Sequence, residues 1–153
     1  MMQELVKSLK TKGLTIASIE SLTGGMFASL MSSVPGASSV FKGSLVSYQT
    51  IVKEEVLHVD KTIIDAYGVI SMECAKAMAI QGEKMFQSDI VVSCTGNAGP
   101  DAMDGKAVGF VCMGILVHDK ISTYEVTFDG NRASIRLQVC EFLKEKVLEI
   151  INN

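Results

Sequence analysis

Apolar residues follow two spacings along the chain, and each spacing predicts one kind of element. Segments in which apolar residues recur every three to four positions, bounded by glycine, proline or a capping serine, predict helices over residues 3–12, 26–33, 49–57, 63–66, 71–85 and 131–151. Short runs of apolar or alternating residues predict strands over residues 14–20, 40–48, 89–94, 107–117 and 123–128. The pattern is therefore one of strands alternating with helices.

This order of elements predicts a three-layer α/β/α sandwich around a five-stranded mixed, mostly parallel sheet. The tight turn at residues 118–120 makes the last two strands antiparallel. If the fourth strand also opposes the third, the other four strands all end at one edge, which is where open α/β sheets bind ligands. Four loops should meet there: residues 21–25, 48–53, 95–106 and 129–132.

Length and composition narrow the classes of protein. The chain has 153 residues, of which 48% are hydrophobic, which suits one folded domain over residues 1–153. A net charge of -3 without a basic stripe argues against a nucleic-acid partner. Glycines, a proline and serines interrupt the longest charge-free run, residues 21–41, so we expect no membrane span. The first residues show no secretion signal, and a cytoplasmic location is expected.

Few groups in the chain suit metal or cofactor chemistry. The four cysteines are widely separated inside apolar segments, which favours buried thiols over a zinc site. Asp101 and Asp104 lie in a long loop, where two carboxylates are more often solvated than bound to magnesium, and they also suit a lid over a pocket. No dinucleotide-binding glycine motif occurs, and Gly105-Lys106 lacks the rest of a phosphate loop. We expect neither metal nor cofactor.

The glycine turn after the first strand is open to two interpretations. Thr23, Gly24 and Gly25 open a helix, whose free N–H groups can hold a phosphate or a developing oxyanion. Alternatively, Ser21 or Thr23 only caps the helix and the glycines allow close packing. This segment alone favours the second interpretation.

A base for hydrolysis must come from His58, His118 or Lys53. Both histidines are expected on the surface, whereas Lys53 follows the second strand by about one helical turn and should face the Ser21 loop. An ordinary lysine is charged at neutral pH, so burial or a neighbouring cation such as Arg132 must lower its pKa. The sequence equally allows the alternative in which Lys53 is no base and pairs with Glu54 or Glu55 on a solvated helix.

Taken together, the loops resemble those of the CinA C-terminal domain family, which includes the nicotinamide-nucleotide amidases. The likeness extends from about Leu14 to Ile150 and rests on five segments in a fixed order: Glu20–Gly25, Val34–Ser39, Phe41–Tyr48, Thr95–Pro100 and Phe128–Arg132. The resemblance implies hydrolysis of nicotinamide mononucleotide (NMN) to nicotinate mononucleotide and ammonia by a serine and a lysine, without metal.

The resemblance also implies roles for individual residues. Ser21 would be the nucleophile, Lys53 the base that takes its proton, and Tyr48 a residue that orients them. Arg132 would hold an anionic part of the ligand or tune Lys53. The pocket would be lined by Thr23, Gly24, Gly25, Thr95 and Gly96.

The chain departs from the family pattern at Leu22, at Gln49–Val52 and in the loop from Asn97 to Lys106. These departures leave two alternatives, a relative that binds a nucleotide without hydrolysing it and an amidase for another small carboxamide. The apolar composition, with a mean hydropathy of +0.31, further predicts a homodimer closed by a hydrophobic patch.

Overall fold

The core of the fold is a five-stranded sheet. The computed structural model describes residues 1–153 and orders the strands β2-β1-β3-β4-β5. Strand β1 pairs in parallel with β2 and β3, while β4 is antiparallel to β3 and β5. Four strands therefore run one way and β4 the other, as the sequence predicted. The strands are β1 (Ile16–Glu20), β2 (Phe41–Val46), β3 (Ile90–Gly96), β4 (Phe110–Val117) and β5 (Lys120–Thr127).

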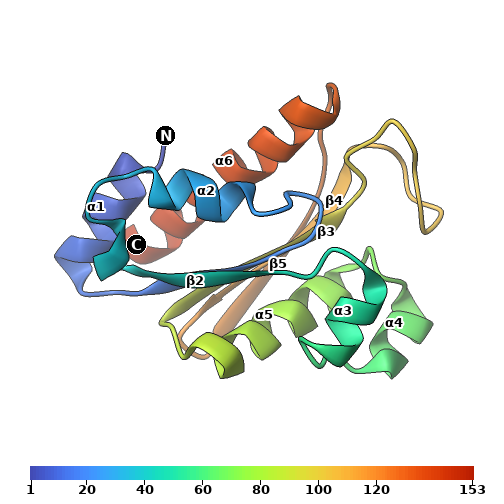
Figure 1. Ribbon diagram of the computed structural model, residues 1–153, viewed down its shortest axis with the longest axis horizontal. Coiled ribbons are helices and arrows are strands. Elements are labelled where there is room, and N and C mark those ends of the chain that lie inside the picture. The colour runs from blue at the N-terminus through green and yellow to red at the C-terminus, as the bar shows by residue number, and fades with distance from the viewer.

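Helices cover both faces of the sheet, which confirms the predicted three-layer sandwich. Figure 1 shows α1, α2 and α6 on one face and α3, α4 and α5 on the other. The helices are α1 (Gln3–Lys12), α2 (Met26–Ser32), α3 (Thr50–Glu55), α4 (Lys61–Tyr67), α5 (Met72–Phe86) and α6 (Arg132–Asn152), with a single 3-10 turn at Ala37–Ser39. No helix combines the length and hydrophobicity that crossing a bilayer requires.

The central strand β3 is buried on both sides. Its successive side chains point to opposite faces of the sheet, and helices cover both faces. Ile90 and Val92 pack in the core beneath α1, α2 and α6, and Val91 packs beneath α5. Gly82 lets α5 approach the sheet closely, since a Cβ atom there would lie 2.5 Å from Ile19 Cγ1.

Three predicted strands, over residues 14–20, 40–48 and 107–117, are longer than the observed ones, whereas β3 extends to Gly96 and β5 begins at Lys120. Strand β2 ends at Val46 because the next two residues turn their carbonyl groups toward Lys53. Strand β4 begins at Phe110, since the N–H of Phe110 turns back to the carbonyl of Ala107 instead of joining the ladder.

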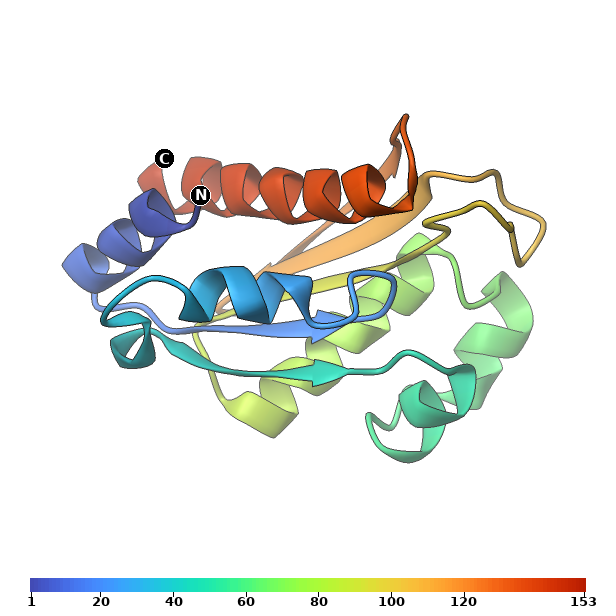
Figure 2. The ribbon, with the colours of Figure 1, turned by 45° about the horizontal axis from the view of Figure 1, so that its top comes forward.

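The loops that follow β1, β2, β3 and β5 lie at one end of the molecule. Figure 2 shows this end opposite the one where the two chain termini lie. The tight turn at His118 joins β4 to β5 at the other end of the sheet, also as predicted. The sheet thus brings the four candidate loops together.

Candidate active site

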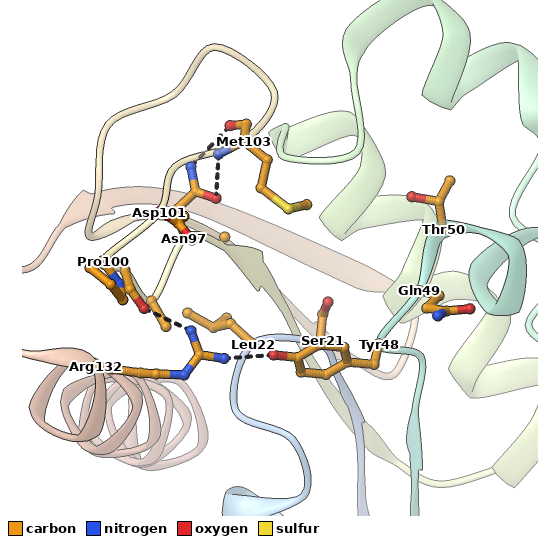
Figure 3. A pocket seen from close by; sticks show the side chains of 13 residues that line it. Ser21, Leu22, Tyr48, Gln49, Thr50, Asn97, Pro100, Asp101, Met103 and Arg132 are labelled. Carbon is orange, nitrogen blue, oxygen red and sulfur yellow. Dashed lines mark hydrogen bonds between the residues drawn. The ribbon is translucent and has the colours of Figure 1, made fainter.

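An open cavity of about 380 Å³ lies where the four loops meet. This volume falls within the usual range for small-molecule sites. Figure 3 shows Ser21 near its centre, with Tyr48 and Arg132 on one side and the loop that follows β3 above them. The lining residues come from all four predicted loops: Ser21, Leu22, Tyr48, Gln49, Thr50, Gly96, Asn97, Ala98, Gly99, Pro100, Asp101, Met103 and Arg132.

Ser21 and Lys53 are in direct contact beside this cavity. The Nζ atom of Lys53 lies 2.9 Å from the Oγ atom of Ser21, although the two residues are 32 positions apart in the sequence. Ser21 lines the cavity, and Lys53 is only 1% exposed. The Nζ atom also bonds to the carbonyl of Ser47 and lies 3.4 Å from that of Tyr48.

Burial lowers the pKa of Lys53 below its ordinary value of 10.5, because the charged amine loses its water. The nearby thiols of Cys74 and Cys94 raise this pKa to a lesser extent. No carboxylate lies within ion-pair distance of the amine, so the pairing with Glu54 or Glu55 does not form. The same three oxygens fit both protonation states. The charged amine donates to all three, whereas a neutral amine donates to the two carbonyls and accepts from the Ser21 hydroxyl.

Arg132 bridges two loops at the mouth of the cavity and does not contact Lys53. Its guanidinium donates to the carbonyl of Gly99 and to the phenol oxygen of Tyr48, each over 2.7 Å (Figure 3). Neither acceptor is charged, and no carboxylate lies within ion-pair distance. Burial, rather than this cation, is therefore the cause of the lowered pKa of Lys53. Tyr48 reaches Lys53 only through its carbonyl, because its side chain pairs with Arg132.

The glycine turn supports the cavity from behind. Thr23, Gly24 and Gly25 do not line the cavity. The hydroxyl of Thr23 and the N–H of Gly25 both donate to the carboxylate of Glu20, and the N–H of Gly24 bonds to the carbonyl of Ser21. The sequence interpretation in which this turn holds a ligand anion is wrong for the start of α2, since a carboxylate of the chain already occupies it.

The loop after β3 forms one wall of the cavity and is held by Asn97. The side-chain amide of Asn97 donates to the carbonyls of Met103 and Lys106 and accepts from the N–H of Met103. Gly96 lines the cavity, whereas the hydroxyl of Thr95 points away from it to the carbonyl of Val69.

Of the remaining candidate groups, Asp101 lines the cavity, and the others lie apart from it or serve the fold. Asp104 accepts a hydrogen bond from the N–H of Ile70, which ties the loop after β3 to the start of α5. No three His, Cys, Asp or Glu side chains form a group that could hold a metal ion. His118 lies at the far end of the sheet, and neither it nor His58 lines the cavity. All four cysteines are buried free thiols, as predicted.

Comparison with known proteins places the chain in a family. The profile described as the CinA C-terminal domain matches residues 1–151. The chain belongs to the CinA C-terminal domain family. Among relatives of this CinA domain, a putative competence-damage inducible protein from Oceanobacillus iheyensis is 43% identical over 137 residues, which is 89% of this chain and 33% of the relative. One of the same description from Bacillus subtilis is 38% identical over 151 residues, covering 99% of this chain and 36% of the relative.

Solved structures share the fold of this CinA domain. A competence or damage-inducible protein from Enterobacter asburiae superposes with a TM-score of 0.95 at 23% identity, covering 98% of this chain and 95% of that one. A competence/damage inducible protein from Agrobacterium tumefaciens has a TM-score of 0.92 at 26% identity, covering 99% of this chain and 93% of that one. The CinA domain spans about a third of the length of the curated relatives it matches.

Sequence reasoning did not assign roles to three residues that shape the site of this CinA domain. Glu20 is an acidic residue that ends an apolar strand, and its position just before a Thr-Gly-Gly turn was a usable signal. Asn97 and Arg136 gave no such signal, because their partners are loop carbonyls that only the folded chain brings near. Arg136 donates to the carbonyls of Leu22 and Thr23 and so supports the Ser21 turn from α6.

Proposed function

We propose that this CinA domain is a serine–lysine amidohydrolase that converts NMN to nicotinate mononucleotide and ammonia. The observation that carries the proposal is the 2.9 Å contact between Ser21 Oγ, at an open cavity, and the amine of a buried lysine that has no carboxylate partner. A serine hydroxyl is a weak nucleophile until a base removes its proton. Burial supports Lys53 as that base, because it makes the neutral amine accessible at lower pH.

The contacts support a two-stage reaction. Ser21 Oγ attacks the carboxamide carbon while Lys53 Nζ accepts the hydroxyl proton. The C–N bond then breaks, and Lys53 returns the proton to the leaving nitrogen, which departs as ammonia. Water next attacks the ester carbon and gives a proton to Lys53. The bond to Ser21 Oγ breaks, that oxygen regains the proton, and the product leaves as a carboxylic acid that ionises.

The choice of NMN is supported by the family resemblance and by the charge of the cavity mouth. Arg132 presents a guanidinium whose partners are both neutral, so a phosphate can replace them with charge-assisted hydrogen bonds. Ser21 and Arg132 line the same cavity, so one ligand can reach both. An amide group at Ser21 and a phosphate at Arg132 match the two ends of NMN.

Ammonia release from NMN by the wild-type protein and two variants tests this proposal. Ser21→Ala removes the nucleophile and Lys53→Met removes the base while keeping an apolar chain of similar length. Each should lower turnover by about 1,000-fold or more. Lys61→Met removes an exposed lysine of α4 and should leave turnover unchanged.

Three other outcomes would change the conclusion. Equal turnover in wild type and Ser21→Ala would refute the mechanism. NMN binding without ammonia release would favour the nucleotide-binding alternative, and ammonia release from a different carboxamide, with NMN inert, would favour another amidase. The homodimer stays a prediction, which sedimentation at micromolar concentration tests.

A further inference from the structure

We propose that Glu20 is a positioning residue of the site, whose buried carboxylate fixes the turn that carries Ser21 and so keeps the Ser21 hydroxyl against Lys53. The inference deepens the proposed function and rests on it for the meaning of that contact. Glu20 does not line the cavity and so touches no substrate there. It acts through the two residues that do the chemistry.

The carboxylate of Glu20 accepts six hydrogen bonds from three segments of the chain. Oε1 accepts from the Thr23 hydroxyl at 2.7 Å and from the N–H groups of Gly25 and Phe27 at 3.1 and 3.0 Å. Oε2 accepts from the N–H of Ala28 at 3.0 Å. It also accepts from two strand hydroxyls, those of Ser18 and Ser44. The side chain therefore ties the Ser21 turn and the start of α2 to strands β1 and β2.

These donors explain why a carboxylate stands at this position. Glu20 is only 1% exposed, so water cannot satisfy the N–H groups at the start of α2. No lysine or arginine lies within ion-pair distance, so the hydrogen bonds alone compensate the buried charge. Each carboxylate oxygen accepts three hydrogen bonds, and three of the six donors are backbone N–H groups at the start of α2, which leaves the turn little freedom.

The main chain of Glu20 also leads to the base. Its carbonyl accepts a hydrogen bond from the N–H of Ser47 at 2.8 Å and lies 3.3 Å from the Ser47 hydroxyl. The carbonyl of Ser47 in turn holds the Nζ atom of Lys53. Both members of the catalytic pair are thus anchored to one residue, Ser21 through the next peptide and the side-chain bonds, and Lys53 through Ser47.

A small displacement of Ser21 relative to Lys53 should slow the chemical step. A shift of about 1 Å between reacting groups can lower a rate by about 100-fold. Glu20→Gln keeps the size of the side chain but replaces one oxygen with an NH₂ group, which opposes the N–H of Ala28 and leaves it without an acceptor. We expect kcat for NMN to fall by about tenfold or more, with KM within about twofold of wild type, because the residues that line the cavity are unchanged.

The test compares Glu20→Gln with Asp60→Asn, which weakens an acidic cap on helix α4 that does not line the cavity. Steady-state kinetics give kcat and KM, and NMR of isotope-labelled lysine gives the pKa of Lys53. In Glu20→Gln this pKa should move up toward 10.5, because a looser turn admits water to the amine. The control Asp60→Asn should leave both kcat and the pKa of Lys53 unchanged. If Glu20→Gln does not fold, Thr23→Val, which removes one bond to Oε1, takes its place with a smaller kcat loss of about threefold.

The two proposals fail in different ways. A glutamine variant that keeps wild-type kcat and an unshifted Lys53 titration overturns the role of Glu20, and so does an equal loss of kcat in Asp60→Asn. A wild-type protein that releases no ammonia from NMN overturns the proposed function instead. In that case the Lys53 titration alone decides whether Glu20 positions the pair.

Discussion

Replacing Lys53 with methionine should change how the stability of the protein depends on pH. In the folded protein, burial lowers the pKa of Lys53 below 10.5, which is its value in the unfolded chain. Between these two pKa values the unfolded state binds a proton that the folded state lacks. The free energy of unfolding of wild type therefore rises with pH in this window. Lys53→Met has no such group and loses this contribution.

The structure sets the size of the effect. A full difference of one proton gives a slope of about 1.4 kcal/mol per pH unit, which is the upper limit for one group. The methionine variant also leaves the buried carbonyl of Ser47 without its partner, which costs about 1–3 kcal/mol. That cost is nearly constant with pH. It therefore offsets the difference in the free energy of unfolding between wild type and Lys53→Met by a constant amount and leaves the slope of that difference against pH unchanged.

Urea unfolding followed by far-UV circular dichroism measures this slope, since the chain has no tryptophan for fluorescence. The range from about pH 7 to about pH 9.5 stays below the unfolded pKa of lysine. Lys61→Met is the control, because Asp65 raises the pKa of exposed Lys61, so any difference in its proton binding lies above 10.5. A Lys53→Met difference as flat as that of the control would show that Lys53 titrates normally, and would refute its assignment as a base.

Three further predictions follow from named contacts. The rate of NMN hydrolysis should rise as pH increases through the lowered pKa of Lys53, because only the neutral amine accepts the proton; a pH-independent rate would contradict this. Asn97→Ala should remove the side-chain hydrogen bonds that hold Met103 within the loop after β3, lowering the free energy of unfolding by about 1–3 kcal/mol and raising KM by about tenfold. Limited proteolysis and kinetics measure both effects. Gly82→Ala should push α5 away from Ile19 and destabilise the fold by about 1–3 kcal/mol, so an unchanged melting temperature would count against the close packing described above.

The fold was predictable because its signals are local. Ser71 caps α5 through the N–H of Cys74, and Gly13 ends α1 in a left-handed conformation, both as the sequence indicated. The short, strongly β-prone run of β3 matches its burial on both faces. The ends of several elements shifted, among them Val46 and Phe110, because hydrogen bonds made only in the folded chain end the ladder there.

The candidate site was predictable only in outline. The order of strands indicated which loops converge, and the resemblance singled out Ser21, Lys53 and Arg132. Nothing local indicated that Arg132 would bind Tyr48 and Gly99 instead of acting on Lys53. Nor did the Thr-Gly-Gly turn reveal that the chain fills its own anion site with Glu20.

The sequence by itself determined the elements, the direction of the strands and the edge at which the chemistry gathers, because periodicity, caps and turns act over a few neighbouring residues. Only the tertiary structure decided how deeply Lys53 is buried, which oxygen it meets and what holds that oxygen in place. These properties arise from contacts between residues far apart in the chain, and water is excluded from Lys53 only after the layers have packed.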